Sequence, residues 1–370
     1  MAMYIVKPWY RKKDDAIYGA EWAGTSDPSW VRTDSAVGFV NPNPYYAGMS
    51  GSPSSPFDNI SPWKDIRRVT DSSAGELVEI PKFYYKWTRD GAKMKLQISM
   101  TKYSGFLTSP AHADKGDGVG ERDYIYIGRY KCGSSNYKSV TGVYPEFNHT
   151  RSSYRTSIHN LGSNIYQNGF SAYWTICILY LVEYAHWGAK LKIGYGSASN
   201  QKTGVSDSMP YHTGTMQSSR STRGAGVQYR YIEDLWGNGY EYVDGIRFSN
   251  RNAYIINNPQ LYDDENNGTN VGIIPYTQGN ISSWNNPANI SGYEYALVPA
   301  SVNGEDYSTY TCSPLYAFNS NDNIVLDIGG YWGGDNENLF TWIARSKNWS
   351  DGTPQAQTSR LMVLPSQRIA

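Results

Sequence analysis

The chain has 370 residues and carries 33 basic and 33 acidic side chains, so its formal net charge at pH 7 is zero. This balance gives neither the basic footprint of a nucleic-acid-binding protein nor an acidic solvating tail. The length allows one large domain or two ordinary ones, each with its own core.

Tyrosine is the unusual residue, with 33 copies against 9 Phe and 12 Trp. A buried tyrosine must find a partner for its hydroxyl, so a core alone would favour other apolar residues. The excess indicates exposed recognition surface. Half-buried strand faces of a β-rich protein are the alternative explanation.

The three cysteines, Cys132, Cys177 and Cys312, are too few and too scattered for a disulfide framework or a metal site. We interpret them as free thiols, with one incidental disulfide left open. Residues 1–10 lack the apolar run of a signal peptide, and the longest apolar run, Ile176–Val182, is too short to span a bilayer. We therefore expect a chain made in the cytoplasm without a signal peptide and without membrane insertion.

Residues 1–65 are closely punctuated by proline and glycine, which leaves room for only short strands and turns. We predict a small β-rich N-terminal module for attachment or oligomerisation, followed by a second domain over residues 66–370.

Three strands are predicted next. Residues 77–87 are β-branched and aromatic, with Pro81 marking an edge or a bulge, whereas residues 93–99 and 123–130 alternate polar and apolar side chains. We expect these segments to be neighbouring antiparallel strands.

Two helices follow. Residues 148–159 offer Asn148 or Thr150 as N-terminal caps, and residues 172–187 carry apolar side chains at helical spacing before a stop at Gly188. We expect the second helix to be largely buried.

The segment Ile232–Gly245 combines a tight Trp236-Gly-Asn turn with a strand of alternating aromatic and acidic residues. Its carboxylates could serve acid/base chemistry or could cap turns by accepting backbone N–H bonds, and the structural interpretation is favoured. These carboxylates belong to Glu233, Asp234, Glu241 and Asp244.

Residues 250–290 contain eleven asparagines, which favour turns over long regular elements, so we expect an exposed insertion. Residues 324–364 alternate short strands with glycine pairs and end in the apolar strand Leu361–Leu364.

Catalytic patterns are not evident in the sequence. The histidines have no metal-ligand spacing, and neither a G-x-S-x-G elbow nor a nucleotide-binding glycine loop is present. Residues 114–121 are acidic and glycine-rich but lack the register of a calcium loop, so a turn is expected there. The histidines are His112, His149, His159, His186 and His212.

The segment 331–349 is the best functional candidate. It mixes large aromatic residues with Asn, Ser, Asp and Gly, which is the composition of an antibody-like paratope. For Trp332, Phe340 and Trp342, burial in the core is an equally weighted alternative.

The order of these segments resembles the C-type-lectin-like fold over about residues 75–366. The quoted elements are Leu77–Tyr85, Tyr124–Tyr130, the two helices, Trp236–Asp244, Gly329–Trp332 and Arg360–Val363. The resemblance is to the version shared by formylglycine-generating enzymes and the variable receptor-binding proteins of phage tails and diversity-generating retroelements. It implies an α+β fold of twisted antiparallel strands, two helices and long loops, preceded by the small β-rich N-terminal module.

Within that superfamily the residues favour a binder. Formylglycine-generating enzymes need a redox cysteine pair in their C-terminal region, where this chain has only Cys312. The closer resemblance is to phage tail proteins of the major-tropism-determinant type, whose final segment faces the host receptor. The resemblance implies these ligand-facing residues: Tyr331, Trp332, Asp335, Asn336, Glu337, Asn338, Phe340, Trp342, Arg345, Lys347, Asn348 and Trp349.

The expected function is therefore attachment of a phage tail or phage-like particle to a bacterial surface receptor, protein or glycan, without enzymatic activity. The resemblance also implies a homotrimer that contacts other tail proteins and is located on the virion. No cofactor is expected, and a structural calcium ion is left open. The alternatives are an enzyme of the formylglycine-generating type and a cellular carbohydrate-binding adhesin.

Overall fold

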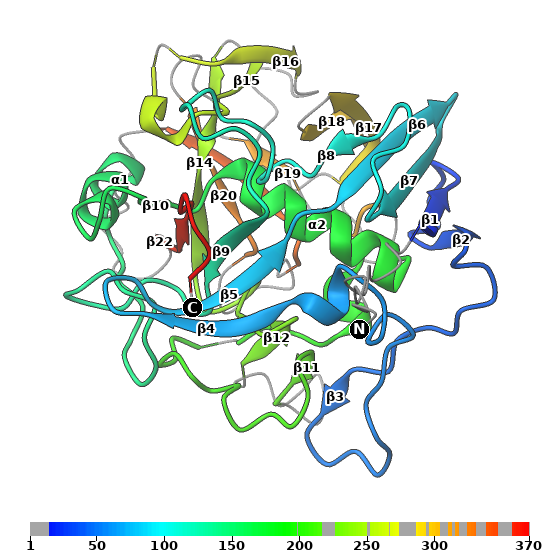
Figure 1. Ribbon diagram of the computed structural model, residues 1–370, viewed down its shortest axis with the longest axis horizontal. Helices are drawn as coiled ribbons and strands as arrows, with labels where there is room; N and C mark the ends of the chain where they lie inside the picture. Colours follow the sequence, from blue (N-terminus) through cyan, green and yellow to red (C-terminus); the bar gives the residue numbers. More distant parts are fainter. Residues whose placement is uncertain are drawn as a thin grey trace, which may run out of the picture.

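The computed structural model is rich in β-sheet and has few helices, which confirms the β-rich α+β class expected from the sequence (Figure 1). The described strands form five sheets. The residues that the structure describes are 15–197, 199–216, 226–249, 252–265, 267–273, 286–293, 296–303, 310–312, 315–317, 324–330, 338–346 and 357–369.

The first sheet has the strand order β2-β1-β7-β6-β8 and crosses the boundary predicted at residue 65. β1 pairs with β7, and Trp22, Phe57 and Trp63 belong to the same core cluster as Leu96. Residues 17–65 therefore share the core of the main domain, in place of the separate module expected from their proline and glycine content. The strands are β1 (Ile17–Trp22), β2 (Trp30–Asp34), β6 (Tyr84–Asp90), β7 (Lys93–Ser99) and β8 (Leu107–Thr108).

The second sheet has the order β10-β23-β9-β5-β4 and combines strands from distant parts of the chain. β23 lies between β10 and β9 and pairs antiparallel with both. The strands are β4 (Arg67–Asp71), β5 (Gly75–Pro81), β9 (Tyr124–Gly128), β10 (Ile165–Gln167) and β23 (Leu361–Val363).

The remaining strands form a small sheet, a larger sheet and a hairpin. The small sheet contains β3 (Tyr45–Tyr46), β11 (Gly214–Thr215), β12 (Val227–Tyr229) and β13 (Ile232–Glu233). The larger sheet contains β14 (Tyr240–Ser249), β15 (Asn252–Ile255), β16 (Thr269–Ile273), β19 (Leu315–Ala317), β20 (Ile324–Ile328), β21 (Trp342–Ser346) and β22 (Gln357–Ser359). The hairpin is β17 (Asn286–Tyr293) with β18 (Ala296–Asn303).

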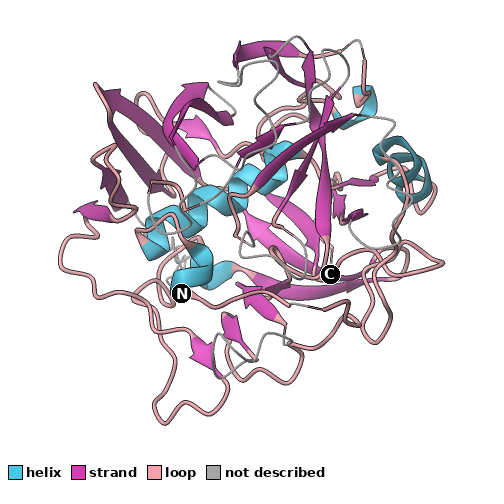
Figure 2. Cartoon of the chain, turned by 180° about the vertical axis from the view of Figure 1, so that it is seen from behind, coloured by secondary structure: helices cyan, strands magenta, loops and turns pink. Residues whose placement is uncertain are grey.

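Helix α2 (Phe170–Tyr184) runs through the centre of the molecule, and all of its residues are buried (Figure 2). The burial predicted from its sequence is confirmed. The predicted stop at Gly188 is wrong, because Ala185 adopts the left-handed conformation (φ 49°) and its N–H donates to the carbonyl of Leu181. The short helix α3 (Ala189–Lys192) begins after Gly188.

Helix α1 (Arg151–His159) lies at the periphery and confirms the other predicted helix (Figure 2). The Thr150 side chain accepts the N–H of Ser153, so Thr150 is the N-cap of the two candidates. Two 3₁₀ turns, η1 (Trp63–Asp65) and η3 (Pro259–Leu261), complete the described helices.

The predicted strands are confirmed, but their arrangement is only partly as expected. Residues 77–87 divide into β5 and β6, which end up in different sheets, and Pro81 is the last residue of β5. β6–β7 and β5–β9 pair antiparallel, whereas β7 and β9 are not neighbours. The asparagine-rich region is expected to favour turns over long regular elements, and its described elements are the short β15, η3 and β16 and the first residues of β17.

Within the described part of the chain, no helix has both the length and the apolar character needed to cross a membrane.

Candidate functional site

The acidic residues of the segment 232–245 are buried and hydrogen-bonded. One carboxylate oxygen of Glu233 accepts the N–H of Gly204 (2.7 Å), and the other accepts the N–H of Ser206 (2.8 Å). Asp234 accepts from the side-chain amide of Asn238 (3.0 Å), which fixes the turn. Burial and the neighbouring charge of Asp234 raise the pKa of Glu233 to about 7.

Arg360 joins three sheets at the centre of this network. Its Nε donates to Glu241 in β14 (3.0 Å), one Nη donates to the carbonyl of Gly128 in β9 (2.8 Å), and the other to the carbonyl of Glu233 in β13 (2.7 Å). The Arg360 and Glu241 side chains are both fully buried. A buried guanidinium that is matched in this way fixes the relative positions of the strands that it contacts.

Asp244 ties α1 to β14. Its carboxylate accepts from Arg155 (2.5 Å), and Arg155 and Arg151 both bind Asp264 at 2.6 Å. Each acidic residue of the segment therefore has partners within the fold. Glu233 accepts backbone N–H groups, as a capping carboxylate does, whereas Glu241 and Asp244 pair with arginines.

His112 and the three cysteines are buried within the fold. His112 is fully buried between Ser109 and the carbonyl of Ile80, and burial lowers its pKa to about 3. None of the three cysteines forms a disulfide in the structure, in agreement with the expected thiols, and all three are buried. Burial raises the pKa of Cys132 and Cys177.

The acidic loop 114–121 forms turns in which its carboxylates already have partners. Asp114 accepts the N–H of Gly116 (2.8 Å), and Asp117 pairs with Arg122 (2.5 Å). Among the residues with described positions, no three His, Cys, Asp or Glu side chains converge as metal ligands would.

Three of the predicted receptor-facing residues are buried. Asn338 accepts the N–H of Ala189 (2.8 Å) and donates to the carbonyl of Cys312 (3.1 Å). Phe340 packs edge-on against Trp187, with ring centroids 5.0 Å apart. The indole N–H of Trp342 donates to the hydroxyl of Tyr173 (3.1 Å).

These contacts correct the prediction for Asn338, Phe340 and Trp342, whose exposed fractions are 0%, 7% and 5%. Side chains that the chain's own core covers offer almost no area to a receptor. For Phe340 and Trp342, the core alternative weighed from the sequence is therefore the correct one.

The other nine predicted residues are not tested. The backbone of Arg345 lies in β21 opposite Val325, and its side chain lies outside the described residues. The remaining eight lie wholly outside them: Tyr331, Trp332, Asp335, Asn336, Glu337, Lys347, Asn348 and Trp349.

The Trp236 turn is hydrogen-bonded to Gly329, close to the end of β20. The N–H of Gly237 donates to the carbonyl of Gly329 (3.1 Å), and the N–H of Gly329 donates to the carbonyl of Thr341 (3.2 Å). Gly329 has φ 84°, and a Cβ there would lie 2.5 Å from the carbonyl oxygen of Leu235. The Trp236 turn, Gly329 and Thr341 therefore form one hydrogen-bonded framework among the described residues.

The sequence reading overlooked Arg360 and Asn338 as structural anchors. An arginine directly before the apolar run Leu361–Leu364 was the available signal, because such a charge in a buried strand requires a partner. Asn338 gave no such signal, since three polar residues, Asp335, Asn336 and Glu337, directly precede it.

No family model matches the chain, and no curated protein matches it.

Proposed function

We propose that the chain is a receptor-binding protein of a phage tail or phage-like particle, with a C-type-lectin-like fold, and that it attaches the particle to a bacterial surface. The contact surface comprises residues 331–337 and 345–349 and no longer includes Asn338, Phe340 or Trp342. Its candidate residues are Tyr331, Trp332, Asp335, Asn336, Glu337, Arg345, Lys347, Asn348 and Trp349.

One observation carries this proposal: both segments are bounded by buried framework. Residues 331–337 lie between the buried residues Gly330 and Asn338, and residues 347–356 lie between β21 and the buried β22. A binding surface is most precise when rigid elements hold the ends of the segments that form it. The aromatic and short polar residues of these segments suit adaptable recognition.

The proposal includes a homotrimer on the virion that contacts other tail proteins, and it assigns no enzymatic activity and no cofactor. The enzyme alternative requires a redox cysteine pair in the C-terminal region, where the sequence has only Cys312. A cellular adhesin would use the same surface, so the neighbouring genes distinguish that alternative.

The test replaces Tyr331, Trp332 and Trp349 together with alanine. Binding of the fluorescently labelled full chain to cells of the host strain is then measured by flow cytometry. We expect binding to fall about tenfold or more, because large aromatic side chains dominate interface energies. The matched control is Tyr144→Ala, which removes an aromatic side chain that is 47% exposed elsewhere on the surface.

Thermal unfolding confirms that each variant is folded. Unchanged binding by the folded triple variant, or an equal loss in the Tyr144 control, overturns the assignment of the surface.

A further inference from the structure

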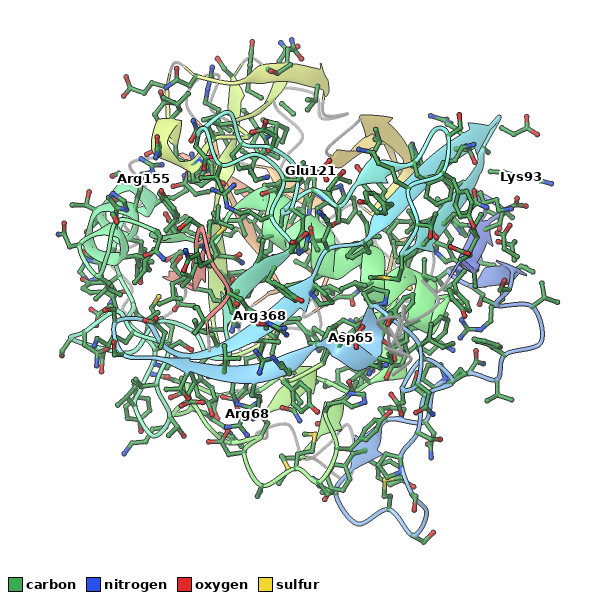
Figure 3. The ribbon with its side chains drawn as sticks, viewed as in Figure 1. Asp65, Arg68, Lys93, Glu121, Arg155 and Arg368 are labelled. Atoms are coloured by element: carbon green, nitrogen blue, oxygen red, sulfur yellow. The ribbon has the colours of Figure 1, made fainter. Side chains whose placement is uncertain are left out.

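A groove lies over β4, β5 and β9, where residues 365–368 approach them. Its volume is about 700 Å³. Figure 3 shows Arg368 and Asp65, two of its lining residues, on the same face of the molecule. The lining side chains used below are Lys64, Arg67, Lys82, Tyr84, Tyr124 and Arg368.

Strand register explains how these side chains meet. Arg67, Glu79 and Tyr126 stand directly opposite one another on β4, β5 and β9. Side chains alternate between the faces of a sheet, so Pro81 and Tyr124, two residues further along, lie on the same face. This face is the floor of the groove.

Glu79 holds two arginines in place. Its fully buried carboxylate accepts from Arg67 at 2.9 and 3.2 Å and from Arg368 at 2.5 and 3.1 Å. Each guanidinium has five N–H donors, so each retains donors beyond this pair of bonds. The arginine side chains are 46% and 47% exposed and are therefore open to the groove.

The groove contains two arginines that share a single acid. Lys64, Arg67, Lys82 and Arg368 line it, and Lys82 pairs with Asp123 at 2.7 Å. Lys82 also pairs with Glu121 at 3.6 Å, whereas Arg67 and Arg368 share the one carboxylate of Glu79, so the arginine pair carries one positive charge more than its acid. An anionic group bound beside the two arginines would balance that charge.

A smaller hollow continues the groove and is lined by a buried arginine that pairs with Asp117 at 2.5 Å but keeps N–H donors unpaired within the described part of the chain. It has a volume of about 230 Å³ and shares Asp123, Tyr124 and Arg368 with the groove. Arg122 lines it and is only 5% exposed, yet its Nε and one Nη have no hydrogen-bond partner among the described residues. Buried guanidinium nitrogens are normally paired.

We propose that this groove is a binding site for a saccharide that carries a carboxylate or a phosphate. The arginine pair recognises the anionic group, because guanidinium geometry matches both acids. The volume exceeds that of a bare anion. Tyr84 and Tyr124 are half-buried at the groove, and cations lie over their rings, Lys102 5.6 Å from the Tyr84 centroid and Arg368 4.0 Å from the Tyr124 centroid, so the uncovered part of each ring is the apolar area for a sugar. The site shares no residue with segment 331–349, so it does not depend on the function proposed above.

The test measures binding to the full chain by isothermal titration calorimetry. The probes are trigalacturonic acid for the carboxylate, glucose 6-phosphate for the phosphate, maltotriose as a neutral sugar and inorganic phosphate as a bare anion. We expect at least one acidic sugar to bind at least about tenfold more tightly than both maltotriose and inorganic phosphate. Its affinity should fall as salt is raised.

Two variants locate the site. Arg368→Gln should weaken binding of the acidic sugar about tenfold or more, and Lys64→Gln should weaken it measurably. Lys64 is exposed and is not a partner of Glu79, so its variant tests the groove even if Arg368→Gln perturbs folding. The matched control is Arg68→Gln, because Arg68 is 43% exposed on the opposite face of β4 and does not line the groove.

The possible results are decisive. Absence of binding by both acidic sugars overturns the proposal. If inorganic phosphate binds as tightly as the acidic sugars, the groove does not require a saccharide. If maltotriose binds as tightly as the acidic sugars, the groove does not require an anionic group. A loss in Arg68→Gln as large as that in Arg368→Gln shows that general surface charge, and not the groove, is responsible.

Discussion

Glu79 shows how a single buried carboxylate organises several parts of the chain. It binds Arg67 of β4, Arg368, which follows β23, and the hydroxyl of Tyr126 in β9. Burial by itself raises the pKa of this carboxyl, but the hydrogen bonds from Arg368, Arg67 and Tyr126 outweigh burial and lower it to about 2. Folding therefore favours the ionised form.

This lowered pKa predicts how stability depends on pH. The stabilisation is present above the ordinary pKa near 4.5 and is lost as the pH falls towards 2. Glu79→Gln should reduce the free energy of unfolding at pH 7 by about 2 kcal/mol, allowing for the solvent exposure of the two arginines. The difference from wild type should shrink between pH 4.5 and pH 2.

Urea unfolding at about pH 7, 4.5 and 2.5 measures this difference, because these pH values run from above the ordinary pKa of Glu79 to near its lowered pKa. The matched control is Glu76→Gln, which changes a partly exposed glutamate on the opposite face of β5 and should leave stability close to that of wild type. A difference that is the same at all three pH values would contradict the assignment.

At the scale of elements, the Trp236 turn depends on a glycine. Gly237 has φ 78°, and a Cβ there would lie 2.6 Å from the backbone nitrogen of Ser197. Gly237→Ala should therefore lower the free energy of unfolding by about 3 kcal/mol or more, since conformational strain and a backbone clash act together. Equilibrium urea unfolding measures the loss.

The matched control separates these two causes. Gly38 also has a positive φ, of 84°, but a Cβ there would have no neighbour within 4 Å. Gly38→Ala should cost about 1 kcal/mol from conformation alone. If the two variants lose equal stability, the close approach at Gly237 is not what the turn requires.

The elements that were predicted correctly are those encoded locally. Alternation identified β7 and β9, cap residues identified α1, and helical spacing identified α2. The partners of the strands were not predictable, because pairing such as that of β1 with β7 depends on residues far apart in sequence.

The candidate site was likewise predictable only in its local features. Its polar and aromatic composition was visible in the sequence, but the burial of Phe340 depends on Trp187 and Trp174, which belong to a distant segment. The groove was not foreseen either. It arises only when register places Arg67 beside Glu79 and residues 365–368 approach that sheet.

The whole molecule is held together by its late strands. β22 pairs parallel with β14, and β23 occupies an interior position between β10 and β9. A chain that ends at residue 356 would lack both strands and also Arg360, the buried link between three sheets. We expect this truncation to abolish the cooperative unfolding transition, because it leaves interior strand edges and buried acids unpaired.

Circular dichroism during thermal unfolding tests the truncation. Addition of a synthetic peptide comprising residues 357–370 should restore part of the transition, whereas a peptide with Arg360 replaced by Met should restore less. A truncated chain that unfolds with the midpoint of the full chain would show that the late strands are dispensable.

The interior position of β23 also has a consequence for synthesis on the ribosome. Arg360 follows its contact Gly128 by 232 positions, so translation continues for about 10–50 s after β9 emerges before its partner exists. During that interval the apolar edge of β9 is accessible to other nascent chains. The yield of folded protein should therefore depend on chaperone capacity and on growth temperature, with slow expression in the cold favouring the native product.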